Sequence, residues 1–155
     1  MASITIEEAI ITIASIIAVT VLASTVLSNF ARLQANYIST INTGNEIMCT
    51  RIKIVYATNV TDKKVKVWVK NIGDTRIKED LLDRTDIFFG KIGNFTRLNH
   101  SQCTFTILNG DSDPYWEKGE TIEITINLNN SLTSGDYYIR IILYNGVKDE
   151  FYFSI

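Results

Sequence analysis

Two different hydrophobic patterns divide the chain near residue 45. From Ala9 to Ala31 no residue is charged, and Ile, Val, Leu, Ala, Thr and Ser dominate. About 20 such residues in a helix span the hydrocarbon core of a membrane. From Ile47 onward, apolar and polar residues alternate in short runs, which is typical of half-buried strands. We therefore predict a transmembrane helix and stalk over residues 1–45 and an extracytoplasmic β-sandwich domain over residues 46–155.

The predicted helix has a start signal and one stop signal. Thr5 precedes Glu7 and Glu8, and acidic residues near a helix N-terminus interact favourably with the helix dipole. No Gly or Pro interrupts the chain from Thr5 to Thr43, so we expect the helix to end at Gly44. A secretory signal would have a basic start, a shorter apolar core and a small-residue cleavage site. The segment is therefore predicted to be a retained anchor.

Small residues recur four positions apart along this helix. Ala14 and Ala18 have this spacing, as do Thr20 and Ser24, and Ser24 and Ser28. The spacing allows two membrane helices to approach closely. Ala, Ser and Thr are also common in membrane helices that have no partner. The spacing alone leaves open whether helix-helix packing uses Ala14, Ala18, Ser24 and Ser28.

The second part contains five candidate strand segments, most of which show period-two alternation. They cover residues 51–60, 64–71, 86–90, 104–108 and 121–128. Alternation of this kind predicts strands with one face toward a core. The side chains expected to face inward are Ile52, Ile54, Tyr56, Val65, Val67, Val69, Phe105, Ile107, Ile122, Ile124, Ile126 and Leu128. Either Trp68 or Trp116 is expected to add to the core.

The last twenty residues predict a β-hairpin. Two apolar runs are joined by Asn145-Gly146, and such a pair supplies the positive φ angles of a type I′ turn. The residues expected to pair are Tyr137, Ile139, Ile141 and Leu143 with Val147, Asp149, Phe151 and Phe153 or the neighbours of these four. Both faces of the first strand are apolar, which predicts a central position. Seven or so short strands separated by turns indicate an antiparallel β-sandwich of immunoglobulin-like size.

Charge and motifs argue against several classes of function. The formal net charge is −2, which gives no basic surface for nucleic acid. The sequence has no nucleophile-base motif, no Gly-rich phosphate loop and no zinc-ligand spacing. We therefore expect neither an enzyme nor a bound cofactor or metal. The basic residues Arg51, Lys53, Lys64, Lys66 and Lys70 are interpreted as a solvated strand face.

Two polar loops remain as weak candidates for chemistry. The single histidine, His100, lies in a polar loop without a partner motif, which is typical of an exposed side chain. An acidic segment contains the carboxylates of Asp111, Asp113, Glu117 and Glu120. Their spacing does not match an EF-hand, so this segment is interpreted as an acidic turn before a strand.

The remaining candidate sites are residues that covalent modification would change, by a disulfide or by a glycan. Cys49 and Cys103 are able to form a disulfide if the domain lies outside the cytoplasm, and the alternative is two buried free thiols. The sequence leaves both alternatives open. Candidate N-glycosylation sequons start at Asn59, Asn94, Asn99 and Asn129. An acceptor must be exported and exposed, so four sequons in one domain favour an outward-facing domain.

The long apolar helix followed by a β-sandwich resembles the archaellin and type IV pilin-like class of archaea, the class III signal superfamily. "MASITIEEAIITIASIIAVTVLASTVLS" is similar to the start of the G-type accessory proteins of the archaellum, FlaG or ArlG. "VKVWVKNIGDTRI", "WEKGETIEITI" and "YYIRIILYNGVKDEFYFS" are similar to the sheet of archaellin-like domains. The resemblance covers the whole chain.

The resemblance implies a location and partners. Members of this family are single-pass proteins of the archaeal cytoplasmic membrane, with the β domain in the pseudoperiplasm facing the S-layer. G-type proteins are expected to self-assemble into homo-oligomers and to act with the F-type archaellum protein (FlaF or ArlF), which holds the S-layer protein. Together they are proposed as the stator of a rotating filament.

Two other functions remain as alternatives. An archaellin or pilin-like subunit would use the same helix to form a filament core. Such subunits carry a short basic leader that ends at a peptidase site, whereas no Lys, Arg or Gly precedes Glu7. The retained anchor is therefore preferred. An enzyme or solute-binding receptor would need convergent polar groups in a pocket, for which the sequence offers almost no candidates.

Overall fold

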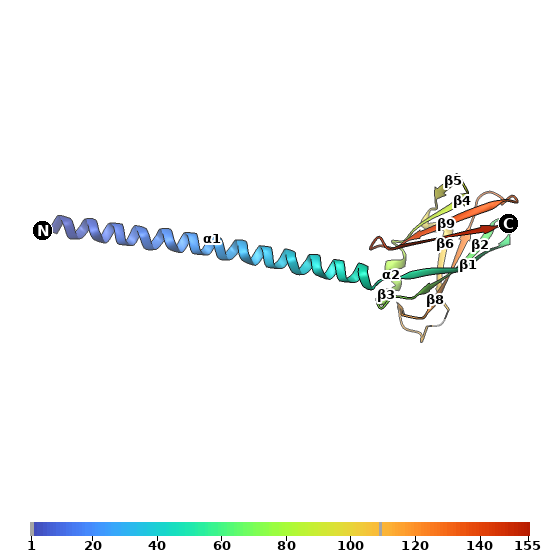
Figure 1. Cartoon of the computed structure of the whole chain (residues 1–155), viewed down its shortest axis with the longest axis horizontal. Helices are drawn as coiled ribbons and strands as arrows, with labels where there is room; N and C mark the ends of the chain where they lie inside the picture. Colours follow the sequence, from blue (N-terminus) through green and yellow to red (C-terminus); the bar gives the residue numbers. More distant parts are fainter. Residues whose placement is uncertain (1, 109) are drawn as a thin grey trace. The chain divides into compact units, whose positions relative to one another are not determined.

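The computed structural model describes residues 2–108 and 110–155, with side chains from residue 5 onward. The chain divides into two compact units, Met1–Gly44 and Asn45–Ile155. Helix α1 (Ala2–Cys49) accounts for the first unit and contributes its last turn to the second. Figure 1 shows this helix in blue to green and the strands that follow it in green to red.

Helix α1 is longer than predicted at both ends. It has 48 residues, which gives a length of about 72 Å at 1.5 Å per residue. It starts before Thr5 and continues through Gly44, so both predicted ends are wrong. A glycine costs a helix only about 1 kcal/mol relative to alanine. Beyond Gly44 the last turn is held by Thr50, whose N–H and hydroxyl both donate to the Glu46 carbonyl, at 2.9 and 2.7 Å.

The second unit contains two antiparallel four-stranded sheets. The first sheet has the order β1 (Ile52–Thr61), β2 (Lys64–Asn71), β8 (Thr121–Asn127) and β6 (Cys103–Ile107). The second has the order β10 (Lys148–Ser154), β9 (Asp136–Ile142), β4 (Asp86–Lys91) and β5 (Asn94–Arg97). Short elements connect them: β3 (Ile77–Lys78), β7 (Tyr115–Trp116), α2 (Glu79–Leu82) and the 3-10 helix η1 (His100–Gln102). This architecture confirms the predicted β-sandwich preceded by one long helix.

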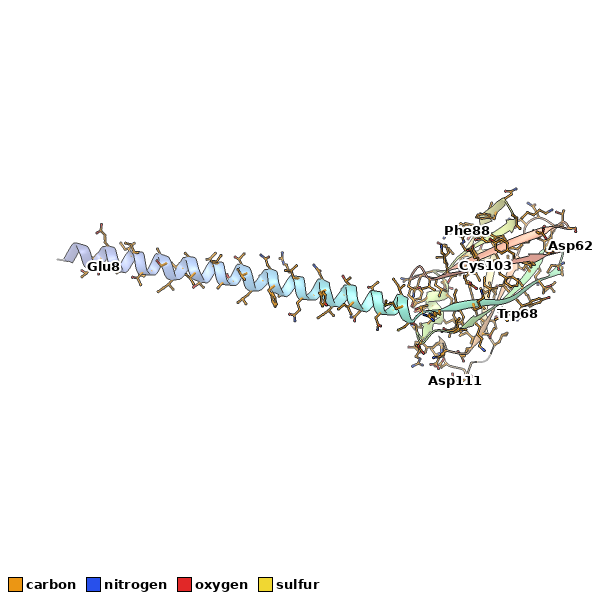
Figure 2. The ribbon with its side chains drawn as sticks, in the orientation of Figure 1. Glu8, Asp62, Trp68, Phe88, Cys103 and Asp111 are labelled. Carbon is orange, nitrogen blue, oxygen red and sulfur yellow. The ribbon has the colours of Figure 1, made fainter. Side chains whose placement is uncertain are left out.

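The core lies between the two sheets and follows the predicted alternation closely. The inward-facing residues of β2 and β8 are fully buried: Val65, Val67, Val69, Ile122, Ile124 and Ile126. Phe105, Ile107 and Leu128 pack against the core and are partly buried. Trp116 is the buried tryptophan, and its indole N–H donates to the Glu120 carbonyl at 3.0 Å. Trp68 instead lies on the outer face of β2, where Figure 2 labels it.

A β-bulge in β1 overturns one of the predicted core positions. The register with β2 shifts between Ile54 and Tyr56, and one extra residue exchanges the faces of the residues that follow it. Ala57 is therefore buried with 3% of its surface exposed, whereas Tyr56 is 55% exposed. The Tyr56 ring stacks on Trp68 on the outer face, with centroids 5.9 Å apart.

The β9–β10 hairpin has the predicted register and a different turn. Ile139 lies opposite Phe151, and β9 is central between β10 and β4, as predicted. Of the turn residues only Gly146 has a positive φ, of 84°, whereas a type I′ turn requires two. The Gly146 N–H donates to the Leu143 carbonyl at 2.9 Å, which matches a three-residue loop with a glycine bulge.

Candidate interaction surfaces

The apolar side chains of α1 lie uncovered in the structure. Every side chain from Thr5 to Thr43 is exposed, and Figure 2 shows them projecting around the helix. The helix is long and apolar enough to cross a membrane. The hydroxyls of Thr12, Ser15 and Thr20 donate to the carbonyls four residues earlier, at 2.7 to 2.8 Å. These bonds satisfy polar groups that hydrocarbon could not solvate.

The predicted helix-packing positions all face outward on α1. Ala14, Ala18, Ser24 and Ser28 are exposed, and the Ser24 hydroxyl donates to the Val21 carbonyl at 2.9 Å. Their shared face leaves room for close contact with another helix. Their role in packing stays a prediction, because the structure contains one copy of the chain.

An aromatic patch lies on the outer face of the second sheet. We define it as Ile92, Phe95, Tyr138 and Tyr152, which line a hollow of about 160 Å³ together with Gly93 and Arg140. Ile92, Phe95 and Tyr152 are 58%, 45% and 60% exposed, whereas Tyr138 lies buried beneath them. The Tyr138 ring centroid is 5.1 Å from that of Phe95 and 5.0 Å from that of Tyr152.

The sheet register explains how these rings meet. Gly90 lies opposite Phe95 on one side and opposite Tyr138 on the other. Because Gly90 has no side chain, the two rings close over it. A Cβ at this position would come within 2.6 Å of the Phe95 Cα. Tyr152 lies directly opposite Tyr138 on β10, and side chains opposite each other share one face.

Charged groups surround the buried ring of the aromatic patch. The Tyr138 hydroxyl donates to Glu150, and Arg140 donates to the same carboxylate oxygen from Nη2 at 2.9 Å. Burial first, and then the bond to Glu150, raises the pKa of Tyr138 to about 12. The bond from Tyr138 first, and then that from Arg140, lowers the pKa of Glu150 below its ordinary value. The patch is thus an apolar surface with a paired, charged rim.

The structure brings two of the four sequon asparagines together. Asn94 and Asn129 line one hollow of about 480 Å³. Asn99 caps η1, where its side chain accepts from the Ser101 N–H at 3.3 Å, and Asn59 lies on β1. All four side chains are exposed. Asn94 precedes Phe95 in β5, so the two side chains point to opposite faces and a glycan at Asn94 would leave the aromatic patch open.

Both cysteines are free thiols in the structure. Cys103 lies opposite Ile126 at one end of β8. Cys49 lies three residues before Ile52, which pairs with Asn71 at the other end of the sheet. A disulfide needs Cα atoms within about 7 Å, and this register keeps the two apart. Burial raises the pKa of the Cys103 thiol to about 11.

The polar loops have structural roles. Asp111 and Asp113 accept backbone N–H bonds from residues two positions later, at 3.2 and 2.9 Å. Glu120 accepts from the Glu117 N–H at 2.7 Å, as expected for an acidic turn. His100 lies 3.3 Å from Asp83 and stacks on Phe105. Within residues 2–108 and 110–155 no group of three His, Cys, Asp or Glu side chains is placed to hold a metal ion.

The aromatic patch was not predicted from the sequence. Its members come from three strands and one turn, between positions 92 and 152. The only local signal is a large apolar residue at an outward position of a strand. Tyr152 is an example, because its neighbours in β10, Phe151 and Phe153, face inward. Strand pairing decides which of these residues meet.

Comparison with known proteins places this chain among archaellum proteins. The family model described as archaeal-type flagellin matches residues 2–153. A protein of Archaeoglobus fulgidus, described as uncharacterized, is 38% identical over 162 residues, which cover 99% of each chain.

Two solved structures are also similar. The archaellum periplasmic stator protein FlaG from Sulfolobus acidocaldarius is 27% identical with a TM-score of 0.56, covering 67% of this chain and 99% of that one. The stator protein complex of FlaF and FlaG from the same organism is 26% identical with a TM-score of 0.57, covering 67% and 89%. These likenesses confirm the resemblance to archaellum accessory proteins.

Proposed function

Because this chain belongs to the archaeal-type flagellin family, we propose that it is a membrane-anchored, stator-like structural component of the archaellum motor. The observation that carries the proposal is the likeness to the solved chain of FlaG, which is covered to 99%. The paired and capped polar residues of the β domain favour a binding protein over an enzyme. The domain boundary near residue 45 separates an anchoring part from a binding part.

Helix α1 is the membrane anchor in this proposal. Its uncovered apolar surface is stable in hydrocarbon and costly in water. A single crossing of the archaeal cytoplasmic membrane takes about 20 residues, so the rest of the 48-residue helix forms a stalk outside it. The β domain then lies in the pseudoperiplasm, facing the S-layer. The similar FlaG is named a periplasmic protein, which supports this placement.

The partner we propose is the F-type archaellum protein, and through it the S-layer. Support comes from the similar complex, in which FlaG is bound to FlaF. The aromatic patch suits such a contact, because exposed aromatic residues around an apolar centre dominate protein interfaces. Arg140 and Glu150 beside it are already paired with each other, so docking there leaves no new unpaired charge.

Copurification of the full chain from archaeal membranes tests this function. The F-type protein is expected to copurify with the tagged wild-type chain. In the double variant Phe95→Ala and Tyr152→Ala, its recovery is expected to fall about tenfold, the effect of losing about 1.4 kcal/mol of binding. Tyr56→Ala is the matched control, because it truncates an exposed aromatic residue on the other sheet.

Either of two results would count against the proposal. Absence of the F-type protein from the wild-type complex would argue against the stator-like role. Equal recovery from the double variant and from Tyr56→Ala would remove the aromatic patch as the docking surface.

A second candidate function is that of a filament subunit, with α1 in the filament core. The family model for archaeal-type flagellin covers nearly the whole chain, and helices that are exposed on all sides suit a filament core. This alternative requires removal of a leader and incorporation into filaments. Intact-mass measurement on the protein from membranes and from purified filaments separates the two functions. A chain that starts at Met1 or Ala2 and stays in the membrane fraction excludes the filament subunit.

A further inference from the structure

The two sheets have four edge strands, which differ in how well they are protected from pairing with a strand of another chain. Edges with unpaired backbone groups attract other strands, and charged residues normally discourage this. Strands β1 and β10 shield each other, because Asp149 of β10 accepts from the Ile54 N–H of β1 at 2.7 Å. Strand β5 carries Arg97, which is paired with Asp86. Among the residues that the structure describes, only β6, with the sequence CTFTI, has neither a charged residue in the strand nor another strand beside its outer edge.

The pairing of β6 with β8 shows which backbone groups point outward. The Leu108 N–H donates to the Thr121 carbonyl at 2.9 Å. Hydrogen-bonded positions alternate along an antiparallel pair, so Thr106 and Thr104 also bond to β8. The N–H and C=O groups of Phe105 and Ile107 therefore point away from β8. At the start of the strand the Cys103 N–H is already used, because it donates to the His100 carbonyl.

We infer that β6 pairs antiparallel with β6 of a second copy of this chain, with Thr106 of each copy on the two-fold axis. This inference rests on the proposed function and deepens it, because it names a second copy of the anchored protein as a further partner of the β domain. Centring the pair on Thr106 places Phe105 opposite Ile107 of the other copy. Both backbone groups of each residue are then used, which gives four hydrogen bonds and leaves the occupied Cys103 N–H undisturbed. The four-stranded sheet that contains β6 in one copy joins the same sheet of the second copy, which gives one continuous eight-stranded sheet.

The side chains around β6 fit the same register. Phe105 and Ile107 are only partly buried and line an open hollow of about 320 Å³ beside the strand, which Glu79, Gly110, Ser112 and Asp113 also line. Residues directly opposite in an antiparallel pair share a face, so the second copy adds its own Phe105 and Ile107 beside this hollow. On the outer face Thr106 meets Thr106, a favourable cross-strand pair.

An identical strand is the occupant that the chemistry favours. An edge that pairs with itself places every charge near its own duplicate, so a two-fold edge contact favours uncharged strands. The strand itself meets this condition, because β6 and its neighbours Gln102 and Leu108 are uncharged. The nearby carboxylates of Glu79 and Asp113 belong to α2 and to the loop after β6. Residues 105 and 107 are both large and apolar, so exchanging them across the axis conserves the packing.

Cysteine cross-linking of the full chain in membranes tests the register. Thr106→Cys is introduced into a chain with Cys49→Ser and Cys103→Ala. Opposite residues of a non-hydrogen-bonded pair have Cα atoms about 4.5 Å apart, within the range of a disulfide. Mild oxidation is expected to convert most of this variant into covalent dimers. The matched control is Thr104→Cys, whose two copies are offset by about 13 Å along the strands at about 3.3 Å per residue and should stay monomeric on denaturing gels.

A charge variant checks the same contact without cysteines. Thr106→Lys places two like charges at the axis and is expected to shift the detergent-solubilised protein to half its mass by light scattering. Val60→Lys puts the same charge on β1, the opposite edge of this sheet, and should leave the mass unchanged. Absence of cross-linking at residue 106, equal cross-linking at residue 104, or an unchanged mass for Thr106→Lys would overturn the pairing. Copurification of the F-type protein is measured on the same samples and judges the proposed function separately.

Discussion

The Tyr144 hydroxyl donates a hydrogen bond to Glu46 Oε1 at 2.5 Å, although 98 positions separate the two residues. Tyr144 lies in the β9–β10 loop, and Glu46 lies in the last turn of α1. Burial first, and then this bond, raises the pKa of the tyrosine above its usual value. In the same loop Asn145 Nδ2 donates to the Thr50 hydroxyl at 3.0 Å. The β domain therefore holds the end of the helix through the chain's last hairpin.

Loss of this bond should destabilise the β domain. Tyr144→Phe removes only the hydroxyl and is expected to lower the free energy of unfolding by about 1 kcal/mol, because a partly exposed bond to a carboxylate contributes about that much. Thermal unfolding of the full chain in detergent measures the change. Tyr152→Phe is the control, since no hydrogen bond of its hydroxyl is seen in the described residues. Equal stability of the two variants would show that the Tyr144 bond contributes little.

Acid should weaken the second sheet through Glu150. The Tyr138 hydroxyl and Arg140 hold the pKa of this carboxylate below its ordinary value of 4.5, so its ionised form is favoured in the folded state. Its contribution to stability is complete above about pH 4.5 and is lost as the pH falls through the lowered pKa. Glu150→Gln should therefore be less stable than wild type at pH 7 and equally stable near pH 2.

Unfolding curves at several pH values measure this difference. Asp62→Asn is the control, because Asp62 is an exposed turn residue with no side-chain ion pair in the described part of the chain. A constant gap between wild type and Glu150→Gln at all pH values would contradict the prediction.

The helix-packing face can be tested by steric block. Ala14→Leu and Ala18→Leu enlarge two small residues on the face that also contains Ser24 and Ser28. Both should reduce helix-helix association in detergent, because small residues permit close backbone contact. Ala23→Leu adds the same volume on the opposite face and should have no effect. Association is measured by energy transfer between labelled full-length chains, and equal signals from all three variants would exclude this face.

Glycosylation should occur at the exposed sequons in the native archaeon. Asn94 and Asn129 are the preferred acceptors, because the Asn99 side chain is occupied as a helix cap. Intact mass of the membrane-extracted protein is expected to fall by one glycan in Asn129→Gln. Ser131→Ala should lose the same mass, since it removes the sequon and keeps the asparagine. An unchanged mass in both variants would show that this site is unused.

Local patterns were sufficient for most of the fold. The uncharged run in α1, the alternation in β2 and β8, and the apolar β9 each act within one element, so period and composition predict them. The central position of β9 follows in the same way from apolar residues on both of its faces. The predicted position of Tyr56 was wrong because a bulge shifts the register of β1 against β2. The predicted turn type was wrong although the register was right, because only Gly146 in the loop has a positive φ.

The sequence by itself determined a long apolar helix, a set of half-buried strands and the faces that these strands bury. Only the tertiary structure decided where the helix ends, which rings form the aromatic patch and which edge strand stays open. The physical reason is the separation along the chain of the residues that interact. Hydrophobic period and turn preference arise between near neighbours in the chain, whereas Glu46 and Tyr144, or Phe95 and Tyr152, meet only after strands from distant parts of the sequence have paired.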